Sequence, residues 1–251
     1  MVFFVKLYLG DIMQRYFVKE KVTNSDLFIL SSDDSHHIKN VMRMNLNDEI
    51  EVVYNGDVCL CEIVDVSTNI KAKIISEIES DSELSCHVTI AQSLLNEQKM
   101  DFILQKTCEL GVSEIIPLQT ARSIINLKGK EEKKLIRWNK IVKEASEQSK
   151  RSKIPTINNV MSLKDLINLD YDYKLLCAVN EMTTTIKKVL SKVKTCDKIL
   201  FVIGPEGGFS KEEEQLLIQN GFISVSFGSR VLRSETAGIY IMSLMNYILM
   251  E

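Results

Sequence analysis

The segment Ile199–Ser210 has the sequence ILFVIGPEGGFS, in which an apolar strand pattern runs directly into a glycine-rich turn. Glycine lets backbone approach a ligand closely, and ligands bind at the carboxyl ends of strands in open α/β sheets. An ordinary turn with Ser210 as the N-cap ahead of Glu213 would explain the serine but not the glycines. The segment matches neither a P-loop nor a Gly-x-Gly-x-x-Gly motif. It therefore predicts a site for a nucleotide-like ligand.

A second segment, Phe227–Ala237, has the sequence FGSRVLRSETA and precedes the last apolar run of the chain. Ser234 or Thr236 can cap the helix expected there, and the free amides of a helix start favour carboxylate or phosphate groups. Arg230 and Arg233 strengthen the prediction of an anionic or polar ligand.

Outward from these segments, apolar strands alternate with helical periods, a pattern typical of an α/β fold with a parallel sheet. The expected strands are Val88–Leu94, Glu114–Leu118, Lys174–Val179, Lys198–Ile203 and Ile223–Phe227. Helices are expected around Met100–Cys108, stopped by Gly111, and around Leu135–Ala145. A last helix over Ala237–Met250 is apolar on nearly every side, which indicates burial in the core or against a second subunit.

The amino-terminal part differs, because short runs from Gln14 to Glu79 alternate apolar and polar residues. Asn55-Gly56 between two such runs predicts a β-hairpin with a type I′ turn. We expect a small β domain over 13–79, an acidic solvated linker over 80–87 and an α/β domain over 88–251. Residues 1–12 form an extension of no assigned role.

The composition of 251 residues, with 45% hydrophobic content, excludes fibrous and disordered classes. The six cysteines have no zinc-type spacing, so no metal is expected. No signal peptide and no membrane span is expected, which predicts a cytoplasmic protein.

The formal charge of −3 argues at first against a nucleic-acid partner. Between Lys128 and Lys153, however, ten basic residues face four acidic ones, a local excess of six. Such a segment is either a solvated helix face or a stripe that faces RNA.

The two carboxyl-terminal segments resemble the paired motifs of the RsmE family within the SPOUT methyltransferases. The likeness extends to further motifs from Met13 onward: Arg15-Tyr16-Phe17-Val18, His37-x-x-x-Val41-Met42-Arg43, Asp48, Gln105-Lys106-x-x-Glu109-Leu110-Gly111-Val112, Pro117, Arg122-Ser123, Arg137-Trp138, Glu144-Ala145-x-Glu147-Gln148-x-x-Arg151 and Pro155.

This resemblance implies a SPOUT-type parallel sheet whose carboxyl-terminal chain forms a trefoil knot, preceded by a PUA-like β-barrel that handles RNA. It implies S-adenosylmethionine as the cofactor and a homodimer formed through the knotted domain. The implied reaction is methylation of N3 of a specific uridine, position 1498 in the standard numbering of 16S ribosomal RNA, with free RNA or the assembled small subunit as substrate.

Carried over to this sequence, the resemblance implies three cofactor loops. They contain Cys177, Ala178, Val179, Asn180, Glu181, Ile203, Gly204, Pro205, Gly207, Gly208, Phe227, Gly228, Val231, Leu232, Arg233, Ser234, Thr236 and Ala237.

Methylating uridine N3 requires loss of its proton and stabilisation of negative charge on a neighbouring oxygen. Our candidates for the cation are Arg122 and Arg233, and Glu206 is either the base or a structural carboxylate. For phosphate contacts we expect Arg15, His37, Arg43, Lys150, Arg151 and Lys153.

The sequence departs from the family pattern in two places. Asn96-Glu97-Gln98-Lys99 stands where relatives have a Lys-Gly-x-Lys type turn, and residues 1–12 have no counterpart in the pattern. Two other functions share many of these features. A ribose 2′-O methyltransferase would keep the cofactor loops, and a non-catalytic RNA-binding protein would need only the basic surface.

Overall fold

The computed structural model describes residues 13–22, 25–178, 181 and 183–249. The chain divides into two compact units, Met1–Asp81 and Ser82–Glu251. Each unit has its own hydrophobic core. Among the described residues, no helix is long and apolar enough to cross a membrane.

The first unit is built on a five-stranded sheet with strand order β1-β3-β4-β5-β2. Its elements are β1 (Arg15–Phe17), β2 (Leu27–Ile29), α1 (Ser32–His36), the π-helix η1 (His37–Met42), β3 (Glu49–Tyr54), β4 (Asp57–Asp65) and β5 (Lys71–Ile78). The hairpin prediction is confirmed, since Tyr54 pairs with Asp57 and both Asn55 and Gly56 have positive φ.

The second unit is built on a seven-stranded sheet in which every pair is parallel, as the alternating pattern predicted. Its elements are β6 (His87–Ser93), α2 (Glu97–Glu109), β7 (Glu114–Gln119), α3 (Glu131–Gln148), β8 (Thr156–Ile157), β9 (Met161–Ser162), α4 (Leu163–Leu166), β10 (Tyr173–Cys177), α5 (Ile186–Leu190), β11 (Lys198–Ile203), α6 (Lys211–Gln219), β12 (Ile223–Val225) and α7 (Ser234–Leu249).

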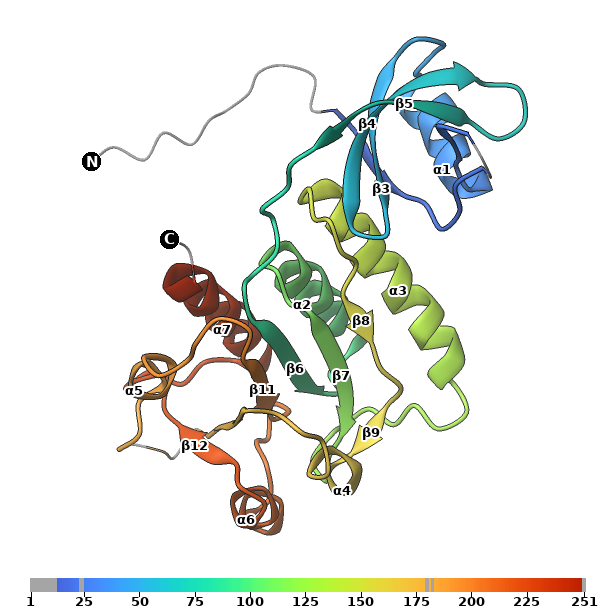
Figure 1. The fold of residues 1–251 in the computed structure, drawn as a ribbon. Helices are drawn as coiled ribbons and strands as arrows, with labels where there is room; N and C mark the ends of the chain where they lie inside the picture. Colours follow the sequence, from blue (N-terminus) through green and yellow to red (C-terminus); the bar gives the residue numbers. More distant parts are fainter. Residues whose placement is uncertain (1–12, 23–24, 179–180, 182, 250–251) are drawn as a thin grey trace. The chain divides into compact units, whose positions relative to one another are not determined.

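Helices cover both faces of this sheet (Figure 1). Apolar residues of α2, α3 and α7 pack in one core with Val88, Ile90 and Phe201, whereas α4 and α6 pack on the other face with Ala91 and Val202. Because successive residues of a strand point to opposite faces, a strand covered on both faces is apolar at consecutive positions, as β11 is from Ile199 to Ile203.

Two sequence expectations need correction. The acidic segment 80–87 is not solvated throughout, because the Glu83 carboxylate accepts hydrogen bonds from the Arg151 side chain and the Ser152 backbone. Helix α7 begins at Ser234 rather than at Ala237, so Ser234 lies inside its first turn. The two hydrogen bonds to Glu83 join residues far apart in sequence, and local sequence patterns do not reveal such contacts.

Candidate cofactor site at the strand ends

Three loops leave the carboxyl ends of neighbouring strands at the same sheet edge. Cys177 at the end of β10 pairs in register with Ile203 of β11 and with Val225 of β12. Because the strands are parallel, the segments that follow all emerge on one side. The structure therefore brings together the starts of the three loops predicted from the sequence.

The first loop, Gly204–Phe209, requires its glycines for different reasons. A Cβ on Gly204 would lie 3.1 Å from the ring of Phe209. Gly208 has φ of +65°, with open space where a Cβ would stand, and its amide donates to the Pro205 carbonyl. Ser210 then caps α6 in a capping box with Glu213, as predicted.

Three side chains from other elements hold this loop. The Ser234 hydroxyl donates to the Gly204 carbonyl at 2.6 Å. The Lys99 ammonium donates to the Glu206 carboxylate at 2.8 Å. The Arg122 guanidinium donates to the carbonyls of Gly207 and Phe209 at 2.8 and 3.0 Å. The loop is thus fixed from α7, α2 and the segment after β7.

The second loop, between β12 and α7, exposes much of its length to solvent. Gly228 has φ of +100° with open space where a Cβ would lie, and the side chains of Val231 and Arg233 are exposed. The amides of Thr236 and Ala237 bond to the Arg233 carbonyl, so they are already paired. Ser234 does not cap the helix with its hydroxyl, which instead donates to Gly204 and accepts a hydrogen bond from Gln92.

The third loop is described only in part, since Val179 and Asn180 lie outside the described residues. Its Ala178 amide donates to the Val225 carbonyl. The Glu181 carboxylate accepts hydrogen bonds from the backbone amides of Thr183 and Thr184. Glu181 therefore fixes the turn that follows this loop.

The three candidates for catalysis have different surroundings. Arg122 already donates to two loop carbonyls, whereas the Arg233 side chain has no hydrogen bond or ion pair to any described residue. The hydrogen bond from Lys99 lowers the pKa of Glu206 below its usual range. A carboxylate with a lowered pKa is a weak base, so the geometry favours the structural interpretation of Glu206 over the basic one.

Lys99 is the residue of this site that the sequence reasoning missed. Asn96, which occupies the position of a family lysine, is the N-cap of α2 and accepts a hydrogen bond from the Lys99 amide. The Lys99 ammonium meets Glu206, and it also lies 3.7 Å from the Glu235 carboxylate. Lys99 is the last residue of the Asn96-Glu97-Gln98-Lys99 turn that the sequence comparison had singled out, and it matches the last lysine of the expected Lys-Gly-x-Lys type turn, which was the available signal.

Three buried side-chain oxygens near this site have no hydrogen-bond partner among the described residues: Ser93 Oγ, which can donate or accept, and the acceptors Gln92 Oε1 and Glu235 Oε2. Gln92 Oε1 and Glu235 Oε2 are both inaccessible to solvent, although Gln92 donates through Nε2 to Ser234. Buried acceptors are nearly always paired, so both atoms indicate a missing donor.

Two of the six residues predicted to contact RNA are buried and form contacts inside the protein. Arg151 is only 2% exposed and donates to the carbonyls of Cys108 and Val112 and to the Glu83 carboxylate. Arg15 is likewise buried and ion-paired with Glu51. The structure therefore contradicts both as phosphate contacts, because neither guanidinium faces solvent.

The other four candidates remain predictions. Arg43 and Lys153 are exposed, and their side chains have no partner among the described residues. His37 is half-buried and its Nδ1 lies 3.0 Å from the hydroxyl of Tyr16. Lys150 is half-buried and has positive φ.

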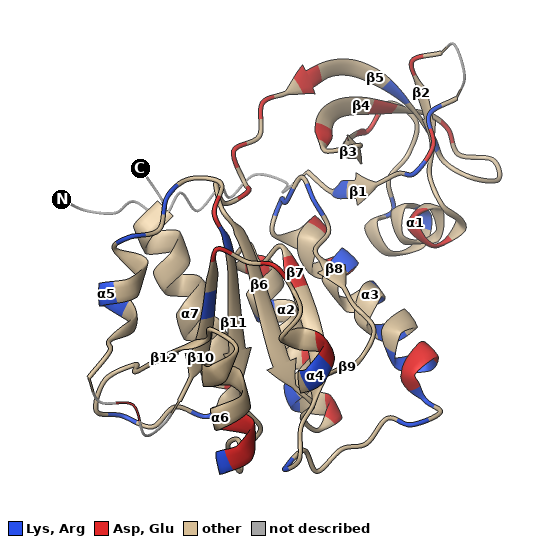
Figure 2. Ribbon diagram, turned by 60° about the horizontal axis from the view of Figure 1, so that its bottom comes forward, with Lys and Arg blue, Asp and Glu red and all other residues tan. Residues whose placement is uncertain are grey.

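The basic segment around α3 carries less free charge than its sequence suggested. Lys134 pairs with Glu97, Arg137 with Glu97 and Asp101, and Arg151 with Glu83. These three acidic residues lie outside the segment and lower its excess from six to three. Figure 2 shows both colours on α3, in agreement with a mixed rather than a uniformly basic face.

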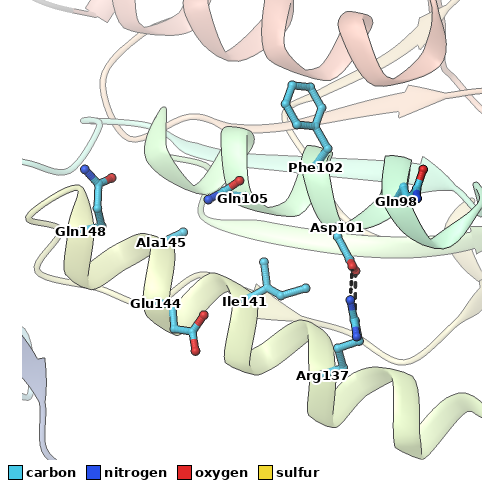
Figure 3. A pocket seen from close by; sticks show the side chains of 9 residues that line it. All are labelled: Gln98, Asp101, Phe102, Gln105, Arg137, Ile141, Glu144, Ala145 and Gln148. Carbon is cyan, nitrogen blue, oxygen red and sulfur yellow. Dashed lines mark hydrogen bonds and ion pairs between the residues drawn. The ribbon is translucent and has the colours of Figure 1, made fainter. Parts of the chain in front are cut away.

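A groove of about 590 Å³ lies between α2 and α3, apart from the loops just described. The Asp101–Arg137 ion pair crosses it (Figure 3). It is lined by Gln98, Asp101, Phe102, Gln105, Arg137, Ile141, Glu144, Ala145 and Gln148. None of the predicted site residues lines it.

Comparison with known families identifies both units. Residues 82–246 match the family described as RNA methyltransferase domain, and residues 30–75 match the RNA methyltransferase PUA domain. The α/β fold with loops at the strand ends thus defines an RNA methyltransferase.

Individual relatives narrow this class. The chain is 35% identical over 247 residues to the ribosomal RNA small subunit methyltransferase E of Bacillus subtilis, covering 94% of this chain and 96% of that protein. It is also 35% identical to the protein of the same name from Mesomycoplasma hyopneumoniae, covering 92% and 98%. The chain belongs to the ribosomal RNA small subunit methyltransferase E family, which confirms the resemblance seen in its motifs.

Solved structures agree. The ribosomal RNA small subunit methyltransferase E of Neisseria gonorrhoeae, bound to S-adenosyl methionine, is 29% identical with a TM-score of 0.84, covering 94% of this chain and 98% of that one. A methyltransferase structure from Legionella pneumophila in complex with the cofactor SAM is 28% identical with a TM-score of 0.85, covering 94% and 97%.

Proposed function

We propose that the chain transfers the methyl group of S-adenosylmethionine to N3 of a uridine in small-subunit ribosomal RNA, in the cytoplasm. The observation that carries the proposal is the fixed loop Gly204–Phe209, which three side chains from separate elements hold at the sheet edge. Family membership and the names of the relatives support the substrate class.

The residues present fit the cofactor. Gly208 and Gly228 have open space where a side chain would stand, so a ligand can approach their backbone. Gln92 Oε1 and Glu235 Oε2 lack a donor among the described residues, and S-adenosylmethionine carries two groups that donate hydrogen bonds, an ammonium and an adenine amine. The residues proposed to hold it are those of the three loops, and when bound it supplies an electrophilic methyl on a sulfonium.

The protein's own contribution is orientation and charge. An in-line displacement needs the uracil nitrogen and the methyl carbon aligned and water excluded. We assign Arg233 to stabilise negative charge on a uracil oxygen, because its guanidinium has no partner among the described residues. Arg122 keeps the glycine loop in place instead.

RNA binding is assigned to both units. Arg43 and His37 in the first unit and Lys150 and Lys153 in the second are the proposed phosphate contacts. The PUA match over residues 30–75 supports a PUA-like barrel for the first unit. For the second unit, membership of the family supports the trefoil knot that the resemblance implies.

A homodimer is part of the proposal. Helices α2 and α7 pack against each other, and both expose large apolar side chains: Phe102 is 46% exposed and Tyr247 82% exposed. Such residues on adjacent helices are typical of a surface covered by a partner. Sedimentation of the purified protein tests this proposal, and a monomer at micromolar concentration would contradict it.

The decisive experiment is mass spectrometry of ribosomal RNA nucleosides from cells with and without the gene, together with methylation of small subunits by the purified protein. Loss of 3-methyluridine at one site supports the proposal. Loss of a 2′-O-methylated nucleoside would assign ribose methylation instead. An unchanged nucleoside profile, with no calorimetric binding of S-adenosylmethionine, would favour a non-catalytic RNA-binding protein.

A further inference from the structure

Lys99 connects three parts of the second unit that are distant in sequence. It lies in the first turn of α2, its ammonium donates to Glu206 in the glycine loop at 2.8 Å, and it lies 3.7 Å from Glu235 in the first turn of α7. Its partners are therefore 107 and 136 residues away along the chain.

The charges around Lys99 explain why a cation is needed there. Two carboxylates approach the same ammonium, and without it they would repel each other across the loop. Arg233 is a further cation near Lys99, and it opposes the charge of Lys99. Hydrogen bonding to Glu206 raises the pKa of Lys99, so it stays an ammonium rather than a base.

Burial makes this contact more than an exposed surface pair. The side chains of Lys99, Glu206 and Glu235 are 28%, 36% and 13% exposed. The Lys99 ammonium lies 3.7 Å from Glu235 Oε1, and Glu235 Oε2 has no hydrogen-bond donor among the described residues. Removing the ammonium would leave Glu235 with uncompensated charge and Glu206 without its anchor.

We propose that Lys99 is the positioning residue of the cofactor site: its ion pairs with Glu206 and Glu235 hold the Gly204–Phe209 loop against the start of α7. This inference rests on the proposed function, because the loop is taken to bind S-adenosylmethionine. Lys99 acts through the loop, and it does not itself react.

The test compares S-adenosylmethionine affinity, measured by calorimetry, in the full-length protein and in Lys99→Met and Lys99→Arg variants. Lys99→Met is expected to weaken binding by about three- to tenfold, the range for a partly buried ion pair. Lys99→Arg keeps the charge and is expected to restore most of the affinity. Lys140→Met is the matched control, because Lys140 meets only Glu144 on the exposed side of α3.

A double-mutant cycle separates positioning from general stability. If Lys99 acts through Glu206, then Lys99→Met combined with Glu206→Gln weakens binding no more than the stronger single change. In methylation assays the KM for the cofactor should rise more than kcat falls.

Should Lys99→Met fold poorly because Glu235 is left unpaired, the additional change Glu235→Gln removes that charge. The affinity of this double variant should still be low. Wild-type affinity in folded Lys99→Met, or in the folded Lys99→Met/Glu235→Gln double variant, would overturn the inference. If the unchanged protein does not bind S-adenosylmethionine at all, the proposed function fails instead.

Discussion

The Ser234 hydroxyl donates to the Gly204 carbonyl across 2.6 Å, and its oxygen also accepts a hydrogen bond from Gln92. One buried hydroxyl thus joins the loop after β11, the end of β6 and the first turn of α7. Because all three elements lie at the carboxyl edge of the sheet, this contact fixes the geometry of the proposed cofactor site.

Replacing Ser234 with alanine should therefore weaken both fold and binding. The change removes the hydroxyl that donates to the Gly204 carbonyl, and it leaves the buried Gln92 amide with the Ser93 carbonyl as its remaining acceptor. We expect a cost of about 1–3 kcal/mol of unfolding free energy. Urea unfolding and calorimetry with S-adenosylmethionine measure the two effects. Ser243→Ala removes an exposed hydroxyl on the same helix and serves as the control. Equal results for both variants would contradict the role of Ser234.

Gly208→Ala tests whether backbone conformation matters at the loop. Alanine at φ of +65° costs about 1 kcal/mol, although nothing blocks its Cβ. Gly129→Ala introduces similar strain at φ of +78° in open space far along the chain. Both variants should lose similar thermal stability, and only Gly208→Ala should bind S-adenosylmethionine more weakly. An unchanged affinity would show that the ligand does not depend on this backbone position.

Arg151→Met tests whether Arg151 stabilises the fold or contacts RNA. Its guanidinium holds two carbonyls and the Glu83 carboxylate in the interior, so its loss should cost about 3–5 kcal/mol of unfolding free energy. Lys153→Met should cost little stability. It should, however, reduce the slope of RNA affinity against salt concentration by about one unit. A reduced salt slope in folded Arg151→Met would return Arg151 to the RNA interface.

These results show which features could be predicted from the sequence. The Asn55-Gly56 hairpin and the five expected strands of the parallel sheet follow from local patterns, and the structure contains them. Strand β12 ends at Val225 instead of Phe227, and the two-residue strands β8 and β9 were not predicted. The glycine loop could be located because glycine is required by local backbone geometry. The contacts that this loop makes with residues far away in the sequence could not be predicted from local patterns.

Pairing across the chain explains what was missed. The charge count over Lys128–Lys153 could not include Glu83, Glu97 and Asp101, which lie outside that segment and neutralise part of it. In the same way, the sequence does not distinguish Arg15 and Arg151 from Arg43. In the structure, Arg15 and Arg151 are buried and ion-paired, whereas Arg43 is exposed. Lys99 was overlooked because its partners are more than a hundred residues away.

Glu114, the first residue of β7, lies at the amino end of its strand. We expect it to make the free energy of unfolding depend on pH. Burial by itself would raise the pKa of Glu114, but hydrogen bonds from Asn158, His87, Tyr171 and Thr89 lower it below its usual range. A carboxyl group whose pKa is lower in the folded state binds its proton more readily when unfolded. Its contribution is therefore present above the ordinary pKa of about 4.3 and is lost as pH falls through the folded value.

Glu114→Gln should remove this contribution. At pH 7 we expect the variant to lose about 1–3 kcal/mol, because an amide cannot accept four hydrogen bonds as a carboxylate does. The difference from the unchanged protein should shrink as the pH falls below the ordinary pKa of about 4.3, because the carboxylate then takes up its proton. Burial raises the pKa of Tyr171 to about 12, so its hydroxyl stays a donor. Tyr171→Phe removes this one donor and should lower the free energy of unfolding less than Glu114→Gln does. Urea unfolding at pH 7 and pH 4 measures both variants, and a difference that is equal at the two pH values would rule out the role assigned to Glu114.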